Sequence, residues 1–139
     1  MEADKANIVR IGQLELRFVV NESGATVFEF IVPSHARVPA PHYHQHADEF
    51  LYGLEGVLTV TVDGRKQELR AGDAVFVPRG SVHHHENLHD GTARVLAAMT
   101  PGTIGRRYFE EIAGVINVPG KPDFAKANEI MLRHGLVPA

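Results

Sequence analysis

Short segments in which apolar and polar residues alternate, separated by glycine and proline, run through most of this 139-residue chain. In residues 14–20, for example, leucine, phenylalanine or valine occupies every second position. Because successive side chains of a β-strand point to opposite faces, this alternation predicts a half-buried strand. The pair Asp63-Gly64 is typical of a tight hairpin turn, and residues 78–80 read Pro-Arg-Gly, which is typical of another turn. Many short strands spaced in this way predict an antiparallel sandwich or barrel.

The pattern changes after Pro101, where apolar residues recur at helical spacing in two groups, at residues 104–116 and 124–131. Asp123 is a start signal for the second helix, and Gly135 is a stop signal.

The length of the chain predicts one domain over residues 1–139, because folding at this size buries roughly two thirds of the surface that the unfolded chain exposes. We expect a barrel at about residues 7–100 and a helical C-terminal extension at about residues 103–139.

Composition excludes several classes of function. The chain contains no cysteine, so disulfides, cysteine-ligated zinc, iron–sulfur clusters and thiol catalysis are excluded. The formal net charge of -3 arises without a long run of one sign, which argues against nucleic acids and anionic membranes as partners. No apolar run approaches the ~18 residues of a membrane span, and residues 1–10 lack the apolar core of a leader, so we predict a cytoplasmic protein.

Six of the nine histidines lie within residues 39–87, in two groups. The groups are His42, His44 and His46, and His83, His84 and His85. On a strand His42 and His44 share a face and offer two imidazoles to one metal ion. Glu49 joins them only if the chain turns near Ala47-Asp48 and starts back on a neighbouring strand. In the second group, parity places either His83 with His85, or His84 alone, on the inward face. Three imidazoles and one carboxylate leave open positions on a divalent ion, as catalytic metal sites do.

These spacings resemble the two conserved motifs of the cupin superfamily. The first motif corresponds to Ala36, His42, His44, Glu49 and Gly56, with alanine in place of the leading glycine. The second motif is complete, at Gly72, Pro78, Gly80, His83 and Asn87. The chain is similar to single-domain bacterial cupins, and its tail resembles that of some quercetinase-like members.

The resemblance implies an all-β fold, an antiparallel jelly-roll barrel. It also implies one divalent transition metal, of Fe, Mn, Ni, Co, Zn or Cu, held by His42, His44, Glu49 and His83. By the same resemblance, Asn87 serves structure, and the chain forms a homodimer through residues 27–32 or the N-terminal strand.

For function, the resemblance favours a dioxygenase that acts on a small molecule, with Glu49 as both metal ligand and general base. A metal-dependent isomerase or lyase is the second hypothesis. A non-catalytic cupin that binds a small molecule is the third, because this fold hosts many functions.

Other candidates have two interpretations each. His46 and His85 either line the cavity as acid–base or substrate-binding groups, or are solvated at its mouth. Tyr52, Phe76 and Met99 either contact an aromatic ligand or belong to the core, and the same holds for Tyr108 and Phe109.

Overall fold

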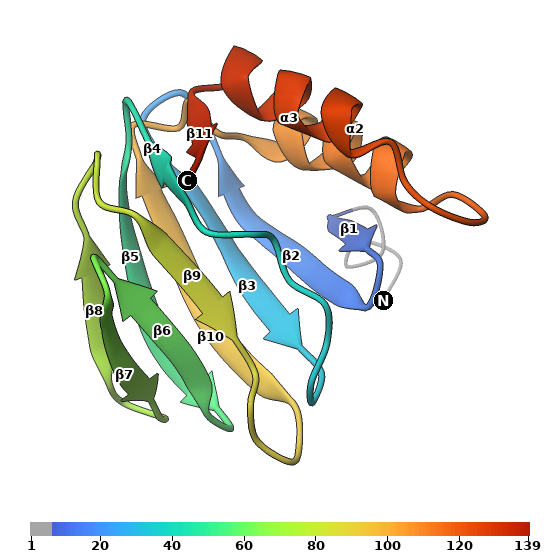
Figure 1. The fold of residues 1–139 in the computed structure, drawn as a ribbon. Helices are drawn as coiled ribbons and strands as arrows, with labels where there is room; N and C mark the ends of the chain where they lie inside the picture. Colours follow the sequence, from blue (N-terminus) through green and yellow to red (C-terminus); the bar gives the residue numbers. More distant parts are fainter. Residues whose placement is uncertain (1–6) are drawn as a thin grey trace.

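The computed structural model describes residues 7–139 and folds them into two antiparallel sheets (Figure 1). Residues 1–6, which belong to the segment searched for a leader, lie outside the described part. The larger sheet has the strand order β1-β2-β3-β10-β5-β8, and the smaller sheet has the order β11-β4-β9-β6-β7. The strands are β1 (Ile8–Ile11), β2 (Leu14–Asn21), β3 (Thr26–Val32), β4 (His42–His44), β5 (Asp48–Glu55), β6 (Leu58–Val62), β7 (Arg65–Leu69), β8 (Ala74–Val77), β9 (His83–Glu86), β10 (Ala93–Thr100) and β11 (Leu136–Pro138). The predicted all-β antiparallel jelly-roll architecture is confirmed.

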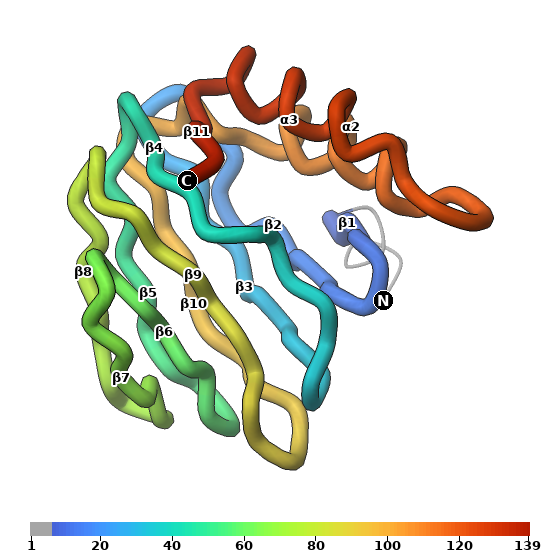
Figure 2. The backbone as a smooth tube through the Cα atoms, in the orientation of Figure 1, coloured from blue at the N-terminus to red at the C-terminus, as the bar shows by residue number. Residues whose placement is uncertain are grey.

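The core lies between the two sheets, which face each other along most of their length (Figure 2). Strand β2 shows the predicted alternation, because Leu14, Leu16 and Phe18 are buried whereas Val19 is exposed. Its neighbour β3 buries Phe28 and Phe30 on the same inner side. Inward residues of both sheets therefore form one apolar interior, and any polar group placed there must have a partner.

The two predicted helices are present as α2 (Arg106–Ile116) and α3 (Phe124–Arg133), and they cover one end of the barrel (Figure 1). Asp123 caps α3 by accepting a hydrogen bond from the backbone N–H of Lys126 at 3.1 Å, as its start signal predicted. No helix within residues 7–139 is long and apolar enough to cross a lipid bilayer.

A last strand, β11, was not predicted from the sequence. Gly135 adopts a φ of 83°, a left-handed conformation suited to glycine, and redirects the chain after α3. Strand β11 then pairs antiparallel with β4, so that Leu136 lies opposite His44 and Pro138 lies opposite His42. With only three residues, β11 is too short to give a periodic signal. The short strand β4 is thus held between β11 and β9.

Asn87 secures the loop that joins β9 to β10. Its side-chain amide donates hydrogen bonds to the carbonyl oxygens of Val32 and Gly91, both at 2.9 Å. Its side-chain oxygen accepts a hydrogen bond from the backbone N–H of His89 at 3.0 Å. Asn87 is buried, and its side chain supplies partners to three backbone groups, of which the carbonyl of Val32 is fully buried.

We expect Asn87→Ala to lower the free energy of unfolding by about 3 kcal/mol, because it removes three hydrogen bonds and leaves the buried carbonyl of Val32 without its side-chain partner. Urea denaturation of the metal-free protein measures this change. The matched control is Asn128→Ala on the exposed face of α3, for which we expect a change within about 0.5 kcal/mol. A loss below about 1 kcal/mol for Asn87→Ala would show that this network contributes little.

Candidate metal centre

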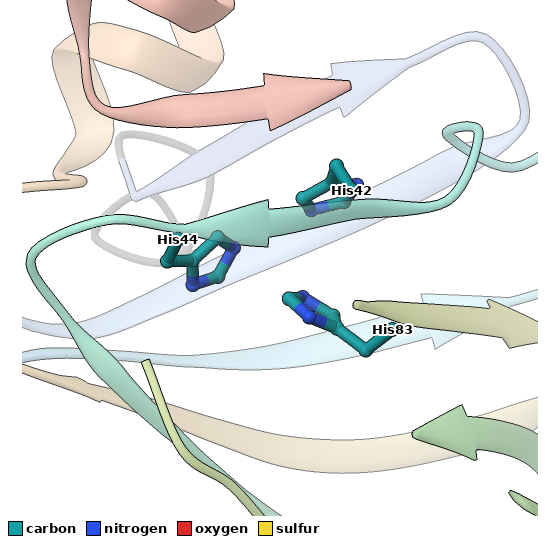
Figure 3. A group of neighbouring side chains, drawn as sticks. All are labelled: His42, His44 and His83. Carbon is teal, nitrogen blue, oxygen red and sulfur yellow. The ribbon is translucent and has the colours of Figure 1, made fainter. Parts of the chain in front are cut away.

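His42, His44 and His83 come together inside the barrel, two from β4 and one from the start of β9 (Figure 3). The ring centroids of His83 lie 4.6 Å from those of both His42 and His44. Each of the three offers a ring nitrogen within 4.8 Å of the other two. His42 also lies opposite His83 in the register of β4 and β9. Strand pairing therefore brings the two histidine groups of the sequence to one place.

Hydrogen bonds to the backbone decide which ring nitrogens are free. The Nδ1 atom of His42 lies 2.8 Å from the carbonyl oxygen of Ala40, and that of His83 lies 3.0 Å from the carbonyl oxygen of Ser81. Because a carbonyl oxygen only accepts, both Nδ1 atoms carry hydrogen and leave Nε2 with a lone pair. Backbone contacts of this kind orient histidines that ligate metals.

Two buried ring nitrogens of this cluster have no hydrogen-bond partner within the described residues: Nε2 of His83 and Nδ1 of His44. An unpaired buried nitrogen is costly unless some other group contacts it. A divalent ion between these lone pairs would satisfy both atoms. The residues therefore fit a metal ion on their own geometry.

Glu49 completes the cluster from the opposite sheet, near the start of β5. Its Oε1 atom lies 3.6 Å from Nε2 of His83 and 3.8 Å from Nδ1 of His44. The sequence placed Glu49 on a strand beside the first histidines, and this detail was wrong, because β4 and β5 belong to different sheets. Asp48 also does not close a local turn: its carboxylate accepts hydrogen bonds from the backbone and side chain of Arg79.

Of the further histidines, His85 joins this cluster. It shares the inward face of β9 with His83, and its Nε2 atom lies 3.2 Å from Oε2 of Glu49. Glu49, His83 and His85 thus form a second group with ligand atoms within 4.8 Å of one another. His84 has the opposite parity and lies 3.4 Å from the carboxylate of Glu86, away from the site. His46 is exposed and packs beside Gly135, so it does not line the cavity.

Burial and mutual contact govern ionisation in the cluster. Burial lowers the pKa of His42 to about 3, and the nearby His83 adds to this effect. Burial lowers the pKa of His44 to about 4, although the carboxylate of Glu49 opposes the change. Burial disfavours the ionised form of Glu49, but its hydrogen bond with His85 and the facing imidazoles outweigh this and hold its pKa below the usual range. Neutral imidazoles beside an ionised carboxylate are the protonation states that metal binding requires.

These pKa values predict that acid destabilises the metal-free protein. Below about pH 6.5 the unfolded chain protonates His44, whereas the folded chain resists protonation until about pH 4. The free energy of unfolding should therefore decrease as the pH is lowered from about 6.5 to about 4, by up to about 1.4 kcal/mol per pH unit for His44 alone. Urea denaturation at pH 7 and pH 5 measures this slope. His44→Gln should reduce it.

A cavity of about 80 Å³ lies against the cluster. Met99, Tyr108 and Phe109 line it, as does Leu136 of the unpredicted strand β11. Tyr52 and Phe76 do not: they point outward from the larger sheet, and their side chains are exposed. Neither residue therefore lines this cavity. Parity could have shown this for Tyr52, because it lies three residues after the inward Glu49 on one strand.

Comparisons with known proteins agree with this architecture. The Cupin_2 family model, described as a cupin domain, matches residues 28–99. The chain is 42% identical over 60 residues to the tetracenomycin polyketide synthase protein TcmJ of Streptomyces glaucescens, a match that covers 43% of this chain and 40% of TcmJ. It is 34% identical over 61 residues to quercetin 2,3-dioxygenase of Bacillus subtilis (strain 168), covering 44% of this chain and 18% of that enzyme. The matches thus span less than half of either relative.

Among solved structures, KdgF from Halomonas sp. superimposes with a TM-score of 0.62 at 23% identity, over 68% of this chain and 84% of that one. This likeness concerns the fold. The family match contains His42, His44, Glu49 and His83, and it includes the strands that bring them together. The chain therefore belongs to the Cupin_2 family of cupin domains.

Proposed function

We propose that this protein is a metal-dependent dioxygenase of a small molecule, with one divalent transition metal held by His42, His44, Glu49 and His83. One observation carries the proposal: Nδ1 of His44 and Nε2 of His83 are buried, have no hydrogen-bond partner within residues 7–139, and face the carboxylate of Glu49. Three neutral imidazoles with one carboxylate suit most first-row ions and leave open positions for ligands. The similarity to quercetin 2,3-dioxygenase over 61 residues supports the choice of reaction.

A bound divalent ion would act as a Lewis acid that increases the acidity of a substrate hydroxyl and brings substrate and oxygen together. The protein's own part is to orient the substrate and receive its proton. Glu49 is the group placed for this, because it is the carboxylate that lines the cavity among the residues that the structure describes. Its low pKa means that it accepts a proton only from a donor of increased acidity, such as a hydroxyl beside the ion.

The walls of the cavity are mostly apolar. Phe28 and Phe30 from β3 and Ile104 and Tyr108 from the tail lie along it. An apolar enclosure strengthens the electrostatic contacts within it and protects reactive species from hydrolysis.

Oxygen uptake tests this function. Protein loaded separately with iron, manganese, nickel and cobalt is mixed with a panel of β-diketones and flavonols, and oxygen is followed with an electrode. We expect uptake with at least one ion and none after the metal is removed by a chelator. Metal-loaded protein that consumes no oxygen with any compound would contradict the dioxygenase proposal.

The same panel distinguishes the second candidate, a metal-dependent isomerase or lyase. The observation that favours it is the same cluster, because a Lewis acid beside a carboxylate also supports proton abstraction. Substrate conversion without oxygen consumption, seen by nuclear magnetic resonance, would indicate this reaction. Binding of a compound without conversion would indicate a non-catalytic binding protein.

A further inference from the structure

We propose that Arg79 and Asp48 are positioning residues of the metal centre, which hold the histidine ligands of one sheet against the carboxylate ligand of the other. This inference rests on the proposed function, because it concerns the same ligands. The need for such residues follows from the topology: His44 and His83 lie on strands of the smaller sheet, whereas Glu49 lies on β5 of the larger sheet. Strand pairing fixes the register within each sheet, but a metal ion bound at about 2.0–2.2 Å also requires a defined spacing between the two sheets.

The turn at residues 78–81, between β8 and β9, contacts two of these ligands through its backbone. The backbone N–H of Gly80 donates a hydrogen bond to the carbonyl oxygen of His44 at 2.8 Å, at the end of β4. The carbonyl oxygen of Ser81 accepts a hydrogen bond from Nδ1 of His83 at 3.0 Å. The turn is therefore fixed to both histidines of the smaller sheet.

Arg79 of the same turn contacts the larger sheet. Its backbone N–H donates a hydrogen bond to Oδ1 of Asp48 at 2.9 Å, and its guanidinium donates to Oδ1 at 3.1 Å and to Oδ2 at 3.2 Å. A bidentate contact between a guanidinium and a carboxylate fixes direction as well as distance. Asp48 directly precedes Glu49 on β5, so this contact holds the backbone that carries the ligand carboxylate. Arg79, Gly80 and Ser81 thus contact one ligand-bearing strand each.

The exposure of this ion pair separates positioning from general stabilisation. The side chain of Arg79 is 50% exposed and that of Asp48 is 30% exposed. Ion pairs as exposed as this one add little to the free energy of unfolding, because water screens the charges and ordering two side chains costs entropy. We therefore expect the pair to affect the arrangement of the metal ligands more than the stability of the fold.

The visible absorption of the cobalt-loaded protein tests the inference without relying on turnover, because it responds to the number and arrangement of the ligands of Co(II). Asp48→Ala removes three hydrogen bonds and should lower the affinity for Co(II) by about tenfold, as expected for a residue that orients metal ligands. Arg79→Ala keeps the backbone contact and should lower this affinity by about threefold. In both variants the absorption at saturating Co(II) should differ from that of the parent protein.

Arg94→Ala is the matched control. The guanidinium of Arg94 also joins two strands, because it lies 2.9 Å from the carboxylate of Glu29 on β3 and 3.5 Å from that of Glu55 on β5. Its side chain is 35% exposed, and none of these three residues lines the cavity. We expect the affinity of Arg94→Ala for Co(II) and its absorption to match those of the parent protein. Urea denaturation of each metal-free variant shows that it is folded and measures its stability.

A double variant tests whether Arg79 acts through Asp48. Replacing both residues with alanine should weaken Co(II) binding no more than Asp48→Ala alone, because the guanidinium has already lost its partner. If Asp48→Ala does not fold, Asp48→Asn serves instead: it keeps an oxygen that accepts from the backbone of Arg79, and it should behave like Arg79→Ala.

The possible outcomes are distinct. Altered absorption and weaker binding in the Asp48 and Arg79 variants, with Arg94→Ala unchanged, support the inference. Absorption and affinity like those of the parent protein in both variants overturn it, as do equal changes in all three variants or losses that multiply in the double variant. Each of these results leaves the proposed metal site standing. Parent protein that takes up no Co(II) overturns the proposed function and this inference together.

Discussion

His83→Ala should abolish metal binding, lowering metal affinity by at least about 100-fold and removing any metal-dependent activity. The expectation follows from geometry, because Nε2 of His83 is buried without a hydrogen-bond partner in the described part of the chain and faces both His44 and Glu49. Even residues that only orient metal ligands contribute about 10–100-fold to affinity, so a ligand itself should contribute at least as much. Elemental analysis of the purified protein and calorimetric titration with Co(II) measure the loss.

The neighbouring histidine supplies the control. His84→Ala changes the same residue type on the same strand, but His84 points away from the site and lies beside Glu86. We expect its metal content and affinity to match those of the parent protein. If His83→Ala retained full metal occupancy, the assignment of this cluster as the metal site would be wrong.

Glu49→Gln should lower the turnover number by about 10²–10⁴-fold, the usual contribution of a general base. The amide keeps an oxygen that can contact the ion but cannot accept the substrate proton. It also weakens the hydrogen bond with His85, whose Nε2 atom lies 3.2 Å from the carboxylate. Steady-state kinetics at saturating metal, with metal content measured in parallel, separate lost chemistry from lost metal.

Glu55→Gln is the matched change on the same strand. The side chain of Glu55 is 65% exposed and lies 3.5 Å from Arg94, outside the cavity. It should leave turnover unchanged. A Glu49→Gln protein with full metal content and unreduced turnover would show that another group receives the proton.

Much of the fold could be predicted because the signals were local. Alternation along residues 14–20 gave the inward face of β2, and the turn residues separated the strands. The motif spacing also pointed to His42, His44, Glu49 and His83, and the structure brings these four side chains together. Whether they hold a metal stays a prediction, as does the pairing of two copies.

The remaining features depend on contacts between distant segments. The pairing of β11 with β4 joins residues far apart in the chain, and three residues carry no periodic pattern. The place of Glu49 in the opposite sheet depends on where the chain crosses between sheets, which spacing alone leaves open. His85 was one of two ambiguous histidines, and its place in the cavity beside Glu49 separates it from the exposed His46. Tyr52 is different, because parity already excluded it from the cavity.

The pairing of β11 with β4 also has a consequence for synthesis in the cell. The backbone of Gln45 donates a hydrogen bond to Gly135, and Leu136 and Pro138 lie opposite His44 and His42. During translation the strand that carries the first two histidines therefore leaves the ribosome long before its partner exists. Contacts of such high sequence separation form late, because the intervening chain must be ordered first. Metal loading is thus expected after translation has passed residue 138, once the nascent chain can complete the edge of its smaller sheet.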